Sequence, residues 1–193
     1  FRGYTTNDIV DEGNGAITLS PSNLNYKGLD LEKRTYLSWA KYFESPEIQV
    51  NRNDIVLVKT GSSLGKIGFC YFDVNGATIN PQLVIIRSKS KYTINPKFLF
   101  FCLLMPYFKS KIVSSNKGGT MPTVTQESIG NINLPIPHIS IQNEIVKYLD
   151  TENLKLDNLI SKQQALIDKL KEYRASIISH AVTGKIDVRE FGA

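Results

Sequence analysis

The C-terminal third of the chain, from Ile141 to Val182, carries a wide apolar stripe at helical spacing. In one heptad register, seven of ten a and d positions are apolar, and neither Pro nor Gly interrupts the run. As a helix it would be roughly 63 Å long at about 1.5 Å per residue. Such a long unbroken pattern is typical of a coiled coil, because the apolar stripe needs a partner.

Flanking residues indicate where this helix begins and ends, and the rest of the sequence indicates what it pairs with. Ser140 is the expected N-cap, and Gly184 stands where a C′ glycine would end the helix. Either the helix lies over its own domain or it pairs with another polypeptide. We favour pairing, because the chain has only one such pattern. Polar seam positions favour one alignment at a cost in stability. The expected contact residues are Leu149, Leu156, Ile160, Gln163, Ile167, Leu170, Arg174 and Ile177.

The chain as a whole has the composition of a soluble folded protein. Its 193 residues can hold one globular domain plus the helix, with 41% hydrophobic and 21% charged residues. No apolar run reaches about 18 residues, so no membrane span is predicted. Cys70 and Cys102 lie in apolar contexts without metal-ligand spacing. We expect buried free thiols, as in a cytoplasmic protein.

Charge is unevenly distributed along the chain. Residues 51–120 carry ten basic and two acidic residues, whereas residues 1–50 have a net charge of −2 and residues 141–193 are balanced. A concentrated positive segment is typical of a protein that binds a polyanion. The alternative is a solvated basic face without a partner.

A Gly/Ser loop between two expected strands lies in this basic segment. The strands are Ile55–Val58 and residues 67–72, and the loop runs from Lys59 to Lys66. It is not a Walker loop, because only three residues lie between Gly61 and Gly65, where the Walker pattern has four, and Ile67 follows Lys66 in place of Ser or Thr. Its polar tip is instead suited to a nucleic-acid backbone.

The remaining segments predict short strands and helices. Strands are expected at 16–19 and 83–87, and an edge strand at 132–134. Asn95 is expected to cap a buried helix at 96–105, which continues after Pro106. Six N-terminal aromatic residues are interpreted as core rather than as a recognition surface: Tyr4, Tyr26, Tyr36, Trp39, Tyr42 and Phe43. The predicted fold class is α+β, a small mixed β-rich domain followed by one long helix.

No catalytic site is evident in the sequence. The two histidines, His138 and His180, stand at opposite ends of the long helix. The segment Asn95–Phe98 resembles the Asn/Asp-Pro-Pro-aromatic motif of amino-methyltransferases, but Lys97 replaces the second Pro. No glycine-rich cofactor loop follows a strand, so a methyltransferase active in its own right is disfavoured.

Three motifs together resemble the DNA specificity subunit of type I restriction-modification systems. The first is Asn53–Leu57 with Gly61–Lys66, and the second is Gly118–Pro122 with the Pro-x-Pro at 135–137. The third is Gln142–Asp150 followed by the helix and the ending Ala181–Asp187. Met121 and His138 depart from the residues usual in the family.

The resemblance implies a DNA target-recognition domain at 1–139, a spacer helix at 140–187 and a tail at 188–193. Family members usually contain two such domains and two antiparallel arms, so this chain would be a half-subunit. It would read half of a bipartite site in double-stranded DNA and bind no cofactor. The arm would dock methyltransferase subunits holding S-adenosylmethionine, and a motor/restriction subunit would join the complex. An antiparallel homodimer of arms is a further expectation.

The expected DNA contacts lie in the loop and in two other polar loops. The set comprises Lys59, Thr60, Ser62, Ser63, Lys66, Lys89, Lys91, Asn116, Lys117 and Thr120. The lysines are expected at phosphates, where they position the protein. Base edges are expected to be read by Ser62, Ser63, Asn116 and Thr120. The alternative function is a protein-only assembly module, or a truncated decoy half-subunit, whose basic face is incidental.

Overall fold

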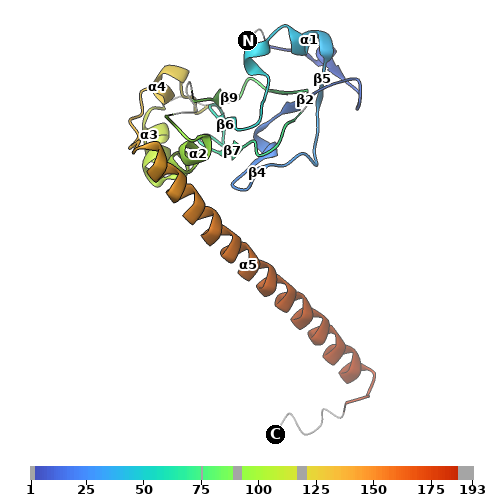
Figure 1. The fold of residues 1–193 in the computed structure, drawn as a ribbon. Coiled ribbons are helices and arrows are strands. Elements are labelled where there is room, and N and C mark those ends of the chain that lie inside the picture. Colours follow the sequence, from blue (N-terminus) through green and yellow to red (C-terminus); the bar gives the residue numbers. More distant parts are fainter. Residues whose placement is uncertain (1–2, 75, 89–92, 117–120, 187–193) are drawn as a thin grey trace. The chain divides into compact units, whose positions relative to one another are not determined.

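The computed structural model describes residues 3–74, 76–88, 93–116 and 121–186 and divides the chain into two units, 1–144 and 145–193. The first unit contains the sheets and short helices, and the second contains most of one long helix. The predicted α+β class is confirmed (Figure 1).

The strands of the first unit form three sheets. A four-stranded sheet has the order β1-β5-β2-β8, in which β2 and β8 are parallel, and an antiparallel sheet has the order β7-β6-β9. Strands β3 and β4 form a small hairpin. The bounds are β1 Ile9–Val10, β2 Gly15–Leu19, β3 Leu24–Asn25, β4 Gly28–Leu29, β5 Tyr36–Ser38, β6 Ile55–Val58, β7 Ile67–Phe69, β8 Ala77–Ile79 and β9 Leu83–Ile86.

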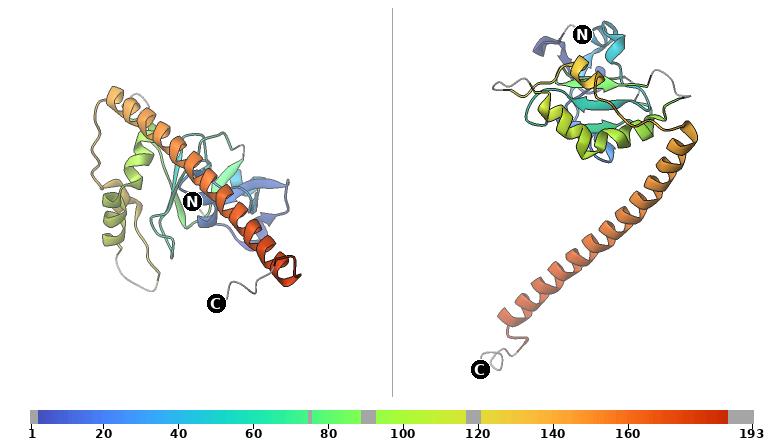
Figure 2. Two further views of the ribbon diagram at one scale, coloured as in Figure 1. Left: turned by 90° about the horizontal axis from the view of Figure 1, so that it is seen from below. Right: turned by 90° about the vertical axis from the view of Figure 1, so that its left-hand side faces the viewer.

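Short helices surround these sheets. Helices α2 and α3 lie along one face of the β7-β6-β9 sheet (Figure 2, right). They are two helices and not one, because Met105, the residue before Pro106, has an extended backbone (φ −61, ψ 143) that interrupts the helix. The helix bounds are η1 Thr6–Asp8, η2 Pro21–Asn23, α1 Trp39–Phe43, η3 Pro46–Ile48, α2 Pro96–Leu104, α3 Pro106–Ser114, α4 Gln126–Gly130 and α5 Ile139–Val182.

Strand β6 is buried on both faces. Its residues Ile55 and Leu57 lie in one core cluster with residues of α2 and α3. The alternate residues Val56 and Val58 lie in a second cluster with residues of β2, β8 and β9. All four are at most 1% exposed. Because side chains alternate across a strand, one apolar run supplies both cores.

The expected edge strand at 132–134 is wrong. Ile132 and Leu134 pack against the first core cluster, but the backbone is not part of a sheet. Ile132 N–H instead donates to Ile129 O (3.3 Å), which continues the turn after α4. The strand predicted over 67–72 ends at Phe69.

The interpretation of the N-terminal aromatic residues as core is also wrong. Tyr26 and Phe43 are each 67% exposed and Trp39 is 42% exposed, while the others are half-buried. Trp39 and Phe43 stack with centroids 6.1 Å apart on the short helix α1. Aliphatic residues of β2 and β5, such as Leu19 and Leu37, fill the interior instead.

Both cysteines are buried free thiols, as predicted. Burial raises the pKa of Cys70 to about 11, although its thiol donates to Phe72 O at 3.0 Å. Burial also raises the pKa of Cys102. Because the thiolate is the reactive form, both residues are core side chains without nucleophilic character.

The buried amide of Gln142 fastens the first turn of α5 within the first unit. Its Oε1 accepts from Asn95 N–H (2.9 Å), and its Nε2 donates to Thr93 O (2.9 Å) and Pro137 O (2.8 Å). Gln142 is 0% exposed, and Asn95 also caps α2 as predicted, accepting from the Lys97 and Phe98 N–H groups. One side chain therefore joins the start of α5 to the start of α2.

Helix α5 is continuous over 44 residues. Ser140 is not its N-cap, because it lies in the first turn, where its N–H donates to His138 Nδ1 at 3.4 Å. Gly184, at φ +72, follows the last turn, and Lys185 N–H closes it by donating to His180 O (2.9 Å). In the described part of the chain, no helix combines the length and apolarity needed to cross a membrane.

We expect Gln142→Leu to lower the free energy of unfolding by about 2–4 kcal/mol, because it removes the three hydrogen bonds that the buried amide forms with Asn95 N–H, Thr93 O and Pro137 O. Urea denaturation with circular dichroism measures the change. Glu144→Ala, at an exposed position two residues on, is the control and should stay within about 0.5 kcal/mol of wild type. Equal effects of the two substitutions would show that the Gln142 bonds contribute nothing.

Candidate nucleic-acid interface

The loop between β6 and β7 forms a tight hairpin end. Val58 N–H donates to Lys66 O (2.8 Å) and Gly65 N–H donates to Val58 O (3.0 Å). Gly61 (φ +103) and Gly65 (φ +81) adopt backbone conformations that favour glycine. As predicted, a strand and not a helix follows Lys66, so the loop lacks the helix N-terminus of a nucleotide-binding phosphate loop.

A neighbouring segment braces this loop from the side. Gly61 N–H donates to Pro122 O (2.9 Å), and Thr60 forms an isolated antiparallel bridge with Thr123. The Thr123 N–H in turn donates to Asn116 Oδ1 (3.1 Å). The loop is therefore held along one side, next to its tip Ser62–Ser63, by the segment 122–123.

The predicted contact residues fall into three groups. Ser62, Ser63 and Lys66 are exposed, with Lys66 Nζ donating to Pro21 O at 3.0 Å. Lys59, Thr60 and Asn116 are half-buried, and the Asn116 side chain is committed to the brace. The structure thus brings the loop residues together with Asn116. The remaining candidates, Lys89, Lys91, Lys117 and Thr120, lie outside the described residues.

An open depression of about 450 Å³ lies on one side of the tip, and we call it the cationic depression. The basic residues Lys66 and Lys109 are among its lining residues. Ser62, Ser63 and Tyr26 contribute hydroxyl groups, and Leu104 is among its apolar lining residues. Lys27 Nζ lies 5.7 Å from the centroid of the Tyr26 ring, adding positive charge near the rim.

Two close-packed contacts bring the distant residues to the cationic depression. Gly68 of β7 approaches the β3–β4 hairpin so closely that an added Cβ would lie 2.7 Å from Gly28 O, which places Tyr26 beside the sheet. Ile67 and Leu103 belong to the first core cluster, so the α2–α3 junction places Lys109 at the same loop. Sequence reasoning missed Tyr26 and Lys109, and the excess of lysine in 51–120 was the only signal for Lys109.

A second depression, of about 330 Å³, lies on the other side of the tip, and we call it the neutral depression. Ser22, Thr60, Ser62, Ser63 and Gln82 line it, without any charged side chain. Gln82 Oε1 accepts from Asn80 Nδ2 (3.3 Å), whereas its Nε2 donates to none of the residues that the structure describes. Nothing in the sequence pattern pointed to Gln82.

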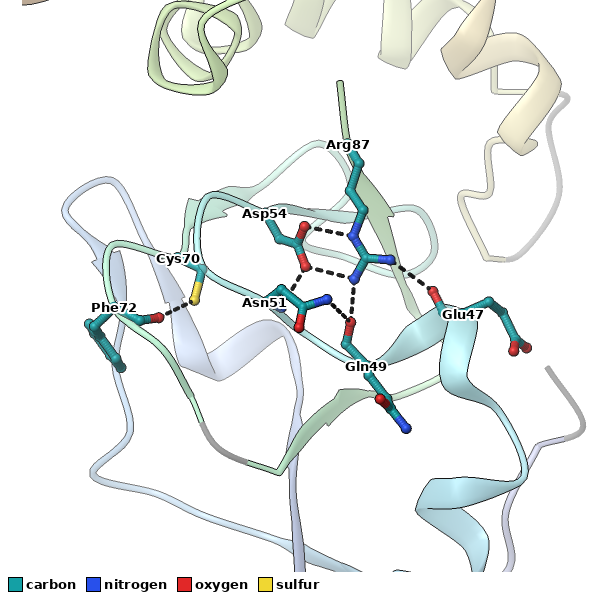
Figure 3. A network of polar contacts seen from close by, with 7 residues as sticks. All are labelled: Glu47, Gln49, Asn51, Asp54, Cys70, Phe72 and Arg87. Carbon is teal, nitrogen blue, oxygen red and sulfur yellow. Dashed lines mark hydrogen bonds and ion pairs between the residues drawn. The ribbon is translucent and has the colours of Figure 1, made fainter. Parts of the chain in front are cut away.

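A partly buried ion pair closes one end of the β6–β9 ladder, next to the paired residues Ile55 and Ile86 (Figure 3). Arg87 Nε and Nη2 donate to the two carboxylate oxygens of Asp54 at 2.7 and 2.8 Å, a bidentate geometry. The carboxylate also accepts from Asn51 N–H (2.6 Å), and Arg87 donates to the carbonyl oxygens of Gln49 and Glu47. The hydrogen bonds to Asp54 raise the pKa of Arg87, so the guanidinium stays charged.

This network supports structure and not catalysis. The Asp54 side chain is 5% exposed, and its two carboxylate oxygens accept three hydrogen bonds. Among the described residues, no three His, Cys, Asp or Glu side chains gather in a metal-ligating group. The site offers a braced polar tip beside a cationic and a neutral depression, a surface suited to binding a ligand.

The fold and this surface define a recognition domain joined to a helix with an apolar seam. A family model described as "Type I restriction modification DNA specificity domain" matches residues 16–172. The chain belongs to this family.

Known proteins similar to this chain are named as specificity subunits of type I restriction enzymes. The chain is 26% identical over 182 residues to the type I restriction enzyme MjaVIII specificity subunit of Methanocaldococcus jannaschii, covering 91% of this chain and 41% of that protein. It is 24% identical over 180 residues to the EcoBI specificity subunit of Escherichia coli, covering 93% and 36%. The chain thus spans less than half the length of these relatives.

Solved structures share the fold. A chain from a study of complex assembly and conformational transition in a type I R-M system aligns with TM-score 0.71 and 18% identity, covering 93% of this chain and 41% of that one. The HsdS subunit of Thermoanaerobacter tengcongensis aligns with TM-score 0.59 and 16% identity, covering 79% and 40%.

We expect Arg87→Gln to lower the free energy of unfolding by about 1–3 kcal/mol, because it leaves the buried Asp54 carboxylate without its ion pair. The lower part of the range for buried pairs applies because the Arg87 side chain is 38% exposed. Chemical denaturation provides the measurement. Arg52→Gln, at an exposed arginine in the same basic segment, removes the same charge and should change stability by less than about 0.5 kcal/mol. A loss no larger than that of Arg52→Gln contradicts a supporting role for the pair.

Proposed function

We propose that this chain is a non-catalytic, sequence-specific DNA-binding subunit of a type I restriction-modification complex that reads one half of a bipartite target. The observation that carries the proposal is membership of the DNA specificity family over residues 16–172. The excess of basic residues in 51–120 supports DNA as the ligand, because phosphate contacts by lysine and arginine release counterions.

The arm supports a role in assembly. Seam residues on α5 are uncovered: Leu156 is 55% exposed, Ile160 59%, Ile167 46%, Leu170 56% and Ile177 42%. A helix of 44 residues with such a stripe needs a partner. We propose that methyltransferase subunits dock on this arm and that a motor/restriction subunit joins the complex.

The chemistry resides in the partners under this proposal. S-adenosylmethionine binds the methyltransferase subunit, and this chain selects the DNA. A second copy of α5, antiparallel to the first, provides the missing seam, so that two chains read an interrupted palindrome. Gln163 and Arg174 on the seam then set the alignment.

A gel-shift comparison with the methyltransferase subunit of its own system tests DNA selection. Duplexes enriched from a random library should bind at least a hundredfold more tightly than random duplexes. Affinity should fall by about a thousandfold between 50 and 200 mM salt if about six phosphates are contacted. Equal binding to all duplexes contradicts the proposed sequence specificity, and a flat salt response contradicts phosphate contact by Lys59, Lys66 and the neighbouring basic residues.

Light scattering coupled to size-exclusion chromatography tests the homodimer. We expect twice the chain mass of 21.7 kDa at micromolar concentration. Ile160→Lys places a charge in the seam and should weaken the dimer at least tenfold. Lys162→Gln, on an exposed position outside the seam, should leave it unchanged. A strictly monomeric wild-type protein would contradict the proposed homodimer.

A further inference from the structure

The Ser62–Ser63 tip separates two depressions of different chemistry. Both serines line both depressions, so a strand of nucleic acid lying across the tip meets the two together. The cationic depression has two lysines from segments far apart in the sequence, Lys66 and Lys109. The neutral depression has hydroxyl and amide groups only as its polar side chains.

We propose that the cationic depression binds a backbone phosphate of the DNA and that the neutral depression presents Gln82 to a base edge beside it. This inference rests on the proposed DNA-binding function and assigns residues to its two tasks. Phosphate contacts position a protein on the duplex, and base-edge contacts specify the sequence.

The geometry of the cationic depression suits a phosphate. The Lys66 ammonium is already held by Pro21 O, which fixes its position while leaving two of its three hydrogens for a ligand. Lys109 is exposed on α3 and carries no ion pair to any residue that the structure describes. Hydroxyl groups of Ser62 and Ser63 supply further donors at the exposed tip. A preorganised set of donors loses little conformational freedom on binding.

The neutral depression suits a base. A carboxamide donates and accepts side by side, which matches the N7 and N6 groups of adenine in the major groove. Asn80 Nδ2 supports Gln82 Oε1, and Asn80 Oδ1 accepts from Gln82 N–H at 3.1 Å, so the side chain is braced at both ends. The Gln82 Nε2 is then the donor directed to a ligand.

The loop itself is rigid enough to keep these two tasks apart. Gly61 N–H is fixed to Pro122 O, and Lys59 N–H donates to Gln82 O at 2.8 Å. The second bond ties the tip directly to the segment that carries Gln82. The hydrogen bond from Lys59 N–H therefore couples the position of the loop, which carries Ser62, Ser63 and Lys66, to that of Gln82.

Salt-dependent binding tests the phosphate assignment, using the chain with its methyltransferase subunit and fluorescein-labelled duplexes. Lys109→Gln and Lys66→Gln should each weaken binding several-fold on every duplex and make the slope of log K against log salt shallower by about 0.9. Lys66→Arg retains the charge and should keep the slope. Lys33→Gln, at an exposed lysine outside both α5 and the basic segment 51–120, controls for net charge and should leave affinity and slope unchanged.

Selection from a random duplex library tests the base assignment. Wild type should enrich adenine at one position of its half-site. Gln82→Ala should lose that preference by roughly tenfold or more, while other positions and non-specific affinity stay as they were. Thermal melting monitored by circular dichroism confirms that each variant is folded.

The outcomes separate this inference from the function on which it rests. A wild-type complex that binds DNA without selectivity or salt dependence overturns both. A selective, salt-dependent wild type, with Lys66→Gln and Lys109→Gln matching Lys33→Gln, overturns the phosphate assignment. Unchanged selection by Gln82→Ala overturns the base assignment. In both of these cases, the proposed function stands.

Discussion

Strand β6 is buried on both faces, and the architecture of the first unit depends on it. Ile55 and Leu57 pack with α2 and α3, while Val56 and Val58 pack between the two larger sheets. Its start is fixed by the Asp54–Arg87 pair and its end by the loop that carries Ser62 and Ser63. A strand without an exposed face leaves no freedom in register, because a one-residue slip would exchange the residues of the two cores.

The loop of the candidate interface is anchored to this buried strand. The loop leaves β6 at Val58, returns into β7 at Ile67 and is braced by Gly61 N–H to Pro122 O. The polar and charged side chains of the loop are thus exposed, whereas strand β6, from which the loop leaves, is entirely apolar. A recognition surface benefits from such a base, since side chains held before binding lose less entropy on binding.

The two units divide charge and apolar surface between them. Basic residues are concentrated in 51–120, whereas residues 141–193 carry equal numbers of each sign. The exposed large apolar residues are numerous on α5, where they include Ile160 and Leu170. The proposed phosphate-binding surface and the apolar seam impose opposite demands on composition, and the sequence keeps basic and apolar residues in separate segments.

The sequence by itself determined the elements whose signals are local. The apolar run Ile55–Val58 predicted a buried strand, Asn95 before Pro96 predicted a helix start, and the unbroken heptads predicted α5. The choice of Ser140 as cap and of a strand at 132–134 failed, because His138 and the turn after α4 compete for the same backbone groups. Tertiary structure alone decided that Tyr26, Lys109 and Gln82 surround one loop tip, and that Gln142 is buried. These groupings depend on contacts between distant segments, such as Gly28 with Gly68, which hydrophobic periodicity does not encode.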